Sequence, residues 1–147
     1  MNILIVEDDY LQADSIYEKV KQAFRLAPQK ISTEQQFRTQ LNEIEKQPPD
    51  LIIMDVMLRW TDPSPDLDIE STPPEVLHQG FYRAGVRCGR LLADSEILRR
   101  TPIILYTILE RADLENDLKE LSGRLRIVHL RKESDPDPLI QLIRDLT

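Results

Sequence analysis

The sequence predicts an α/β fold in which five parallel strands, each followed by a helix, form one open sheet covered on both faces. Two observations predict it. Short continuous apolar runs, typical of strands buried on both faces, recur along the chain. Segments with apolar residues at helical spacing separate these runs. Because the strand–helix order repeats five times with no additional strand, we expect a flavodoxin-like, doubly wound, three-layer α/β/α arrangement rather than a closed barrel.

The elements follow from the positions of the apolar residues. Strands are expected at 3–6, 30–32, 51–56, 103–106 and 126–130. The helices between and after them are indicated by five apolar faces: Ala13, Ile16, Val20 and Phe24; Phe37, Leu41 and Ile44; Leu77, Phe81, Ala84, Cys88 and Leu91; Leu114, Leu118 and Leu121; and Leu139, Leu142, Ile143 and Leu146.

Length and composition restrict the class of protein. The 147 residues favour a single domain spanning 1–147. A formal charge of −7 argues against a chain that binds nucleic-acid phosphates directly. The single cysteine, Cys88, excludes an intramolecular disulfide and a multi-cysteine zinc site. No apolar run approaches the roughly 18 residues of a membrane-spanning helix, so we expect a cytoplasmic protein without membrane contact.

Polar residues lie at the carboxyl ends of four expected strands, where the functional crevice of an open α/β sheet is found. Glu7 and Asp8 follow the first strand, Asp55 lies near the end of the third, and Thr107 and Lys132 follow the last two. Crowded carboxylates need a compensating cation, and Mg²⁺ prefers oxygen ligands. A carboxylate beside Mg²⁺ can attack a phosphoryl group. Each residue alone has an ordinary structural explanation, but together they indicate a phosphoryl-accepting site.

Four segments carry a resemblance to a known family. Ile3–Asp9, Leu51–Leu58, Thr101–Thr107 and His129–Lys132 resemble, in order and over nearly the whole chain, the receiver domain of two-component response regulators. The resemblance implies that Asp55 takes a phosphoryl group from a phosphohistidine on a sensor histidine kinase or phosphotransfer protein, with Mg²⁺ as cofactor. It also implies roles for the neighbours of Asp55: Glu7, Asp8 and the main-chain carbonyl of Met57 as magnesium ligands, Thr107 and Lys132 as phosphoryl contacts, and His129 as the switch residue.

The sequence departs from the family pattern at three positions. Ile108 stands where a small residue normally follows the switch hydroxyl, Glu133 replaces the proline after the lysine, and Arg59 replaces a proline after the phosphoacceptor. These departures leave open a non-phosphorylated pseudo-receiver that acts as an interaction module. An Asp-nucleophile phosphatase is a weaker alternative, because Met57 occupies the place of the second carboxylate that such enzymes use.

The middle of the chain contains more residues than the fold requires. Thr107 lies 52 residues after Asp55, whereas a strand–helix–strand unit takes about 30 or somewhat more. We therefore expect a proline-rich acidic insertion at 59–75, inside the single domain. It is either a surface insertion without a role or a specificity element beside the site, with Trp60 as its anchor.

Arg83, Arg87 and Arg90 recur at helical spacing after the insertion. They form either a solvated face, paired in part with the insertion, or a surface that docks an acidic partner. We expect a stand-alone signalling domain rather than an enzyme, apart from slow self-phosphorylation and dephosphorylation. Its output would pass through an unidentified downstream protein, and a homodimer is left open.

Overall fold

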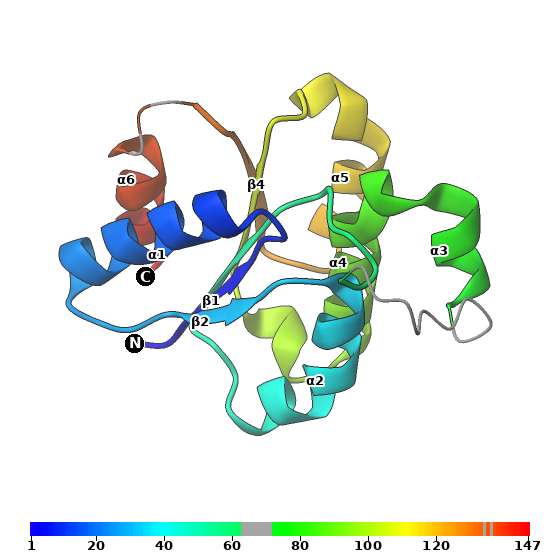
Figure 1. The fold of residues 1–147 in the computed structure, drawn as a ribbon, viewed down its shortest axis with the longest axis horizontal. Coiled ribbons are helices and arrows are strands. Elements are labelled where there is room, and N and C mark those ends of the chain that lie inside the picture. Colours follow the sequence, from blue (N-terminus) through cyan, green and yellow to red (C-terminus); the bar gives the residue numbers. More distant parts are fainter. Residues whose placement is uncertain (63–71, 134, 136) are drawn as a thin grey trace.

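The chain has a three-layer α/β/α architecture around one parallel sheet (Figure 1). The computed structural model describes residues 1–62, 72–133, 135 and 137–147. The sheet order is β2-β1-β3-β4-β5, and every neighbouring pair is parallel. The strands are β1 (Ile3–Val6), β2 (Gln29–Ile31), β3 (Leu51–Met54), β4 (Ile103–Thr107) and β5 (Ile127–Arg131). The predicted flavodoxin-like sheet is therefore confirmed.

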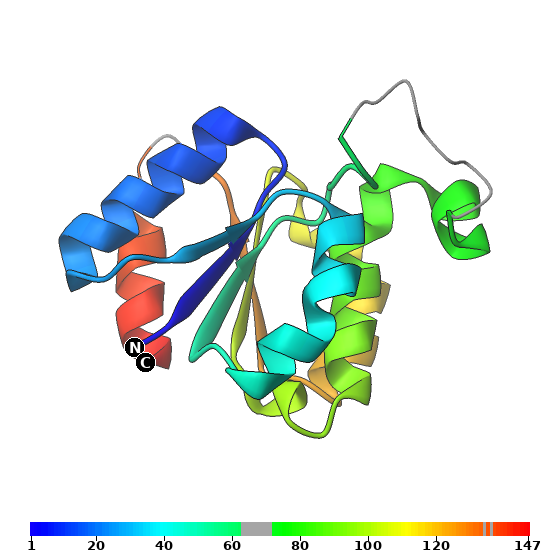
Figure 2. The same cartoon turned by 60° about the horizontal axis from the view of Figure 1, so that its bottom comes forward.

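Helices cover both faces of the sheet. The described α-helices are α1 (Tyr10–Phe24), α2 (Glu34–Lys46), α3 (Pro74–Gln79), α4 (Ala84–Asp94), α5 (Glu115–Ser122) and α6 (Asp137–Leu146), with short 3-10 turns η2 (Phe81–Arg83), η3 (Leu98–Arg100) and η4 (Arg111–Leu114). Figure 2 shows α1 and α6 on one face and α2, α4 and α5 on the other. Within the described residues, no helix has both the length and the apolar character needed to cross a membrane.

Alternation along the strands divides the core into two halves. Leu4 of β1 packs in the cluster that includes Phe37 of α2. Its neighbour Ile5 points the other way, into the cluster with Val20 of α1 and Ile143 of α6. Successive strand residues face opposite sides of a sheet, so a sheet covered twice needs apolar residues at every position. This double burial explains the continuous apolar runs in the sequence.

The helix predicted from Leu77 onward is not continuous, because it is interrupted at Gly80. Gly80 follows α3 with φ +71° and ψ −166°, a backbone conformation that favours glycine and ends the helix. The side chains of Leu77 and Phe81 are 61% and 50% exposed. Ala84 and Cys88, which lie on α4, are buried as expected. The apolar spacing therefore predicted one helix where the structure has two, α3 and α4.

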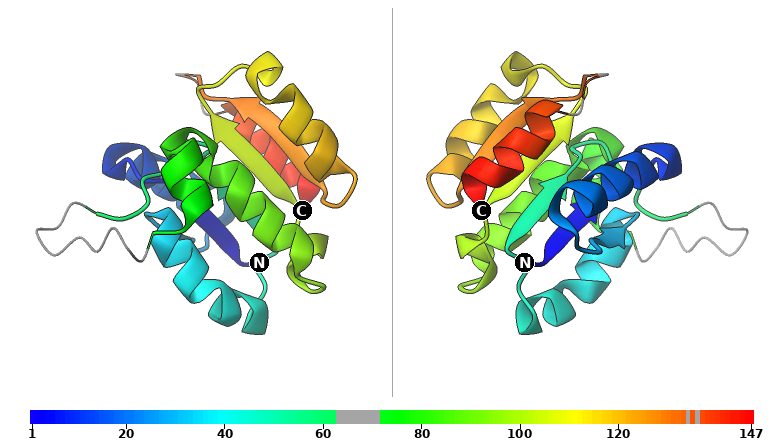
Figure 3. Two further views of the ribbon diagram at one scale, coloured as in Figure 1. Left: turned by 90° about the vertical axis from the view of Figure 1, so that its right-hand side faces the viewer. Right: turned by 90° about the vertical axis from the view of Figure 1, so that its left-hand side faces the viewer.

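The predicted insertion, 59–75, is only partly described. Residues 63–71 of this stretch lie outside the described residues. Its last two residues already belong to α3. Figures 2 and 3 show α3 beside the start of α4 and outside the three layers of the fold. The insertion thus ends in a short helix attached to the face that α2 and α4 cover.

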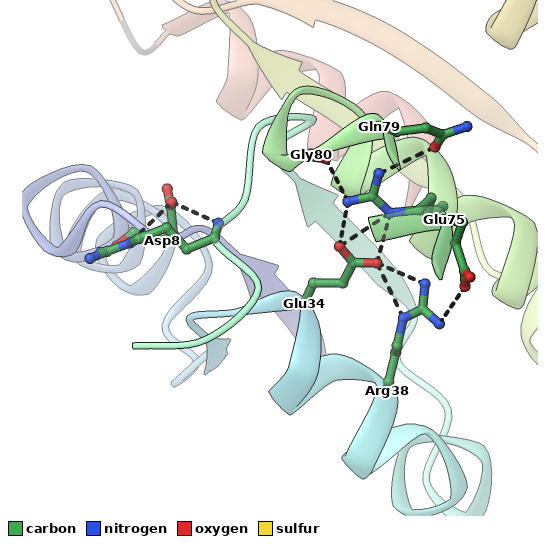
Figure 4. Close-up of polar contacts among 8 residues, drawn as sticks. Asp8, Glu34, Arg38, Glu75, Gln79 and Gly80 are labelled. Carbon is green, nitrogen blue, oxygen red and sulfur yellow. Dashed lines mark hydrogen bonds and ion pairs between the residues drawn. The ribbon is translucent and has the colours of Figure 1, made fainter. Parts of the chain in front are cut away.

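A buried ion pair joins α2 to α4 (Figure 4). The Arg87 guanidinium donates to both carboxylate oxygens of Glu34, with Nη2 to Oε1 at 2.6 Å and Nε to Oε2 at 3.0 Å. The side chains of Glu34 and Arg87 are 0% and 3% exposed. The prediction that Arg87 belongs to a solvated or partner-docking face is therefore wrong. A carboxylate on a distant helix holds this arginine inside the molecule.

The same ion pair anchors the end of α3. Arg87 Nη2 donates to the main-chain carbonyl of Gly80 at 2.8 Å. Arg38, one turn along α2, donates to Glu34 Oε2 at 2.8 Å and to Glu75 Oε1 of α3 at 3.1 Å. Two arginines and two glutamates thus connect three helices, and hydrogen bonds satisfy the buried charges.

Removing the charge of Glu34 should therefore destabilise the fold strongly. Glu34→Gln leaves the buried Arg87 guanidinium without a counter-charge, and we expect the free energy of unfolding to fall by about 3 kcal/mol. Urea unfolding followed by circular dichroism measures this change. Glu43→Gln is the matched control on the same helix, because the Glu43–Lys46 pair is 71% and 69% exposed. The control should cost less than about 1 kcal/mol, and equal losses in the two variants would contradict the prediction.

Candidate functional site

Four of the predicted site residues lie together at the carboxyl ends of β1, β3 and β5. Lys132 Nζ donates to Glu7 Oε2 at 2.7 Å and to Asp55 Oδ2 at 2.9 Å. One carboxylate oxygen from each of Glu7, Asp8 and Asp55 lies within 4.8 Å of the others. Glu7 and Asp55 are buried, whereas Asp8 is partly exposed. Parallel strands bring these residues together, because their carboxyl ends share one edge of the sheet.

The donor set fits a hard divalent cation. Three carboxylate oxygens in this spacing, with one acid open to solvent, are the ligands that Mg²⁺ uses together with water. The backbone of Met57 lies beside Asp55, since its N–H donates to Asp55 Oδ1 at 3.4 Å. The role of the Met57 carbonyl as a further ligand stays a prediction.

Burial and crowding control the ionisation of the site. Burial and repulsion from Asp55 raise the pKa of Glu7 from 4.5 to about 7, although Lys132 opposes the shift. For Lys132, burial opposes the charged ammonium, but the Asp55 and Glu7 carboxylates outweigh this effect and raise its pKa. Lys132 therefore stays a cation, and Glu7 is the group that titrates near neutrality.

Thr107 and His129 meet through the backbone of Leu109 rather than at Asp55. Thr107 is fully buried, and its Oγ1 accepts a hydrogen bond from the Leu109 N–H at 3.4 Å. The half-buried His129 places Nε2 at 2.9 Å from the Leu109 carbonyl oxygen. The main-chain N–H of Lys132 donates to the Thr107 carbonyl at 2.7 Å, which ties the ends of β4 and β5 together. The predicted switch residues are thus neighbours at one edge of the site.

Sequence analysis did not assign two residues that contact the charged groups. Gln12 Oε1 accepts from Lys132 Nζ at 2.5 Å. Arg59 binds Asp8: its main-chain N–H donates to Oδ2 at 3.0 Å, and its guanidinium Nε lies 3.4 Å from the same oxygen. Gln12 lies one helical turn after Asp8, and that spacing was a usable signal. For Arg59, the sequence showed only a departure from the family pattern.

A cavity of about 310 Å³ opens beside the site, between α1 and the ends of β4 and β5. Gln12 and Lys132 line it, together with Ile108, whose side chain is 56% exposed. Ile108 therefore borders the approach to the site instead of filling the core. The described residues contain no cis peptide bond, so Lys132 and Glu133 are joined in the trans form.

The loop after β3 is clamped on one side by the start of α4. The Gly85 N–H donates to the Val56 carbonyl at 2.8 Å, and the Leu58 N–H donates to the Phe81 carbonyl at 3.2 Å. A Cβ atom on Gly85 would lie only 2.2 Å from the Asp55 carbonyl oxygen. Close backbone approach thus requires glycine here, and sequence analysis did not detect this positioning residue.

The same loop is clamped on its other side by the start of α2. The N–H groups of Glu34 and Gln35 each donate at 2.9 Å, to the carbonyls of Arg59 and Trp60 respectively. The partly buried Trp60 ring lies 5.6 Å from the Arg38 guanidinium carbon. Trp60 therefore contacts α2 at the beginning of the insertion. Its roles as the anchor of a specificity element and as a partner contact stay predictions.

Arg83 and Arg90 pair with α5. Arg90 Nε lies 3.1 Å from Glu120 Oε1, and Arg83 Nη1 lies 3.6 Å from Asp117 Oδ2. Their side chains are 38% and 36% exposed, so both remain reachable from solvent. Their described partners are on α5 and not in the insertion, and a role in partner contact stays a prediction.

Gly85→Ala should destabilise the fold and displace the loop that carries Asp55. The new Cβ meets backbone atoms of Asp55, which cannot move aside as a flexible side chain can, so we expect a loss of at least about 1–3 kcal/mol. Thermal and urea unfolding measure the loss. Gly89→Ala on the same helix is the control, because its Cβ meets only the Leu121 side chain, at 3.2 Å. A loss in Gly85→Ala no larger than in the control would contradict the steric argument.

The raised pKa of Glu7 predicts a pH-dependent stability. Between pH 4.5 and about 7 the folded state binds more protons than the unfolded state. Stability should therefore fall as pH rises through this window, by about 1.4 kcal/mol per pKa unit. Glu7→Gln removes the titration, so its stability relative to wild type should rise from pH 5 to pH 8. Urea unfolding in metal-free buffer tests this, with Glu43→Gln as an exposed control. A pH-independent difference between Glu7→Gln and wild type would refute it.

Comparison with solved structures shows the receiver fold. A putative response regulator from Chloroflexus aurantiacus matches with a TM-score of 0.67 and 19% identity, over 99% of this chain and 95% of the other. A signal receiver domain of a histidine kinase from Clostridium thermocellum gives 0.72 and 10%, over 99% and 95%. A similar domain from Syntrophus aciditrophicus gives 0.67 and 23%, over 99% and 88%.

At the sequence level, no protein-family model and no curated protein matches the chain. The similarity therefore lies in the sheet order, the helical layers and nearly the full length of the receiver structures. Together with the acidic cluster at the carboxyl edge of the sheet, it leads to one conclusion about architecture. The chain has the fold of the signal receiver domains of two-component systems, with an acidic pocket at the end of its sheet.

Proposed function

We propose that the chain is the phosphoryl-accepting receiver of a two-component phosphorelay, with Asp55 as the phosphoacceptor. The observation that carries this proposal is the placement of Asp55. Its buried carboxylate lies 2.9 Å from Lys132 Nζ and shares a cluster within 4.8 Å with Glu7 and Asp8. A lone buried carboxylate is costly, and a structural role requires only one cation. Three acids with one lysine at a strand edge suit an anionic substrate that arrives with a metal.

The transfer would be centred on Asp55. A carboxylate oxygen of Asp55 attacks the phosphorus of a phosphohistidine on a sensor kinase or phosphotransfer protein. The P–N bond breaks, and the electron pair leaves with the imidazole. Lys132 would then stabilise charge on the phosphoryl oxygens, and Thr107 would donate its hydroxyl hydrogen to one of them. Mg²⁺ held by Glu7, Asp8, Asp55 and the Met57 carbonyl would offset the repulsion between the two anions.

The contacts at Leu109 support a switch at the edge of the site. Thr107 Oγ1 now accepts from the Leu109 N–H, and the Leu109 carbonyl contacts His129. If Thr107 turns toward a phosphoryl group, Leu109 loses that hydrogen bond and its contact with His129 changes. A local charge change would thereby alter the surface near β5 and α5, which is how such switches act.

The output would pass through protein contacts. We propose a downstream protein as the receiver of the signal, with the half-exposed Arg83 and Arg90 and the insertion anchor Trp60 as candidate contacts. We do not propose direct binding of nucleic acid, since the net charge is −7. The chemistry is that of a cytoplasmic signalling domain that is phosphorylated and slowly loses its phosphoryl group, rather than that of an enzyme with turnover.

One observation favours a second function. Arg59 pairs with Asp8, one of the expected metal ligands, at the position where the family has proline. A chain in which this pair is permanent would keep the fold without being phosphorylated, and it would act as an interaction module. The two functions predict opposite results in a phosphorylation assay.

Incubation with Mg²⁺ and acetyl phosphate tests the proposal. We expect an adduct with the mass of one phosphoryl group in the wild type, and at least a tenfold smaller yield in Asp55→Asn, measured by intact mass spectrometry. Asp9→Asn is the matched control, because Asp9 lies at the same edge but caps α1 through the Gln12 N–H, and asparagine caps equally well. No adduct in wild type would favour the interaction module, whereas turnover without an adduct would favour a phosphatase.

A further inference from the structure

The Arg59 side chain lies against Asp8, one of the three acids of the cluster. Its guanidinium Nη2 donates to the Asp8 main-chain carbonyl at 2.7 Å, and Nε lies 3.4 Å from Oδ2. Its side chain is 41% exposed, against 11% for Lys132. The acidic cluster thus has two protein cations of different kinds: one enclosed by carboxylates, the other at the solvent boundary.

The backbone of Arg59 is fixed independently of its side chain. Its carbonyl accepts from the Glu34 N–H at 2.9 Å, and its N–H donates to Asp8 Oδ2 at 3.0 Å. These bonds hold the main chain and orient Asp8 regardless of which side chain residue 59 carries. The exposed guanidinium can therefore move into solvent without unfolding the loop, whereas Lys132 cannot leave without breaking bonds to Glu7 and Asp55.

The charges of the acidic cluster and its two cations indicate competition between Arg59 and a divalent cation. When ionised, Glu7, Asp8 and Asp55 carry −3, while Lys132 and Arg59 carry +2. A divalent cation added to this set would leave an excess of +1, with the guanidinium beside the metal. If the guanidinium leaves Asp8, the total becomes zero. Like charges in a partly buried site repel, so the neutral arrangement is preferred.

We propose that Arg59 competes with the divalent cation for Asp8, so that it weakens metal binding and leaves the carboxylate when the cation enters. This inference deepens the proposed function and rests on its metal site. It assigns to the chain's own arginine a role as an internal counter-ion that sets the cation concentration at which the acidic cluster becomes occupied. The residue regulates the site without contacting the phosphoryl group.

Direct titration of cation binding tests the proposal. We expect Arg59→Gln to bind Mg²⁺ about three- to tenfold more tightly than wild type, because the cation no longer has to displace one partly exposed ion pair. Titration with MgCl₂ by calorimetry gives the dissociation constant without reference to phosphorylation. Fluorescence of Trp60, the single tryptophan and the residue after Arg59, reports movement of this segment.

Two further variants separate charge from fold. Arg59→Lys keeps the positive charge and should bind Mg²⁺ close to the wild-type affinity. Arg124 lies just before β5, at the other end of the sheet, and its side chain is 50% exposed and pairs with Asp94. Arg124→Gln should leave the affinity unchanged. Circular dichroism establishes that each variant is folded before titration.

The outcomes distinguish this inference from the proposed function. Tighter Mg²⁺ binding in Arg59→Gln, with the affinity of Arg59→Lys and Arg124→Gln close to wild type, supports the competition. Equal or weaker binding in Arg59→Gln overturns it and leaves the proposed phosphoacceptor site standing. Absence of binding in both wild type and Arg59→Gln overturns the competition together with the metal part of the proposed function. Tighter binding without any Asp55 adduct supports the competition but contradicts phosphoryl transfer.

Discussion

The loop that carries Asp55 is held between the first turns of two helices, and the rest of the site depends on this double attachment. Helix starts have free N–H donors, and here α2 and α4 direct theirs at carbonyls of the loop. Val56 meets Gly85 on one side, and Arg59 meets Glu34 on the other. The buried ion pair between Glu34 and Arg87 then fixes the two helices to each other. The loop carbonyls accept hydrogen bonds from the first N–H groups of the two helices, and the helices in turn fix the position of Asp55.

The two cations of the site, Lys132 and Arg59, differ in how deeply they are buried. Lys132 is nearly buried between Glu7 and Asp55, and removing it would leave two carboxylates without a partner in a poorly solvated place. The Arg59–Asp8 pair lies at the surface, where ion pairs contribute little and break easily. The site therefore has an enclosed cation beside Asp55 and a more exposed one beside Asp8. Under the competition proposed above, this asymmetry would let Arg59 leave Asp8 while Lys132 keeps its bonds to Glu7 and Asp55.

The sequence predicted those parts of the site that topology brings together. Asp55 and Lys132 lie at strand ends, and a parallel sheet places such ends side by side, so their proximity required no knowledge of side-chain packing. Arg87 could not be placed in this way. Helical spacing identified its own face of α4, but its partner is on another helix 53 residues earlier. The helix break at Gly80 could not be predicted for a related reason, because apolar spacing alone does not report a left-handed backbone position.

The helix α3, in which the insertion ends, is connected to the Asp55 loop through the ion pair between Glu34 and Arg87. Arg87 binds Glu34 and the Gly80 carbonyl at the end of α3 with the same guanidinium nitrogen. Any displacement of α3 therefore strains the attachment of α4 to α2. Since Gly85 contacts the backbone of Asp55 and Val56 directly, such strain reaches the loop within one turn of α4. The described end of the insertion is thus connected, through two helices, to the loop that carries Asp55.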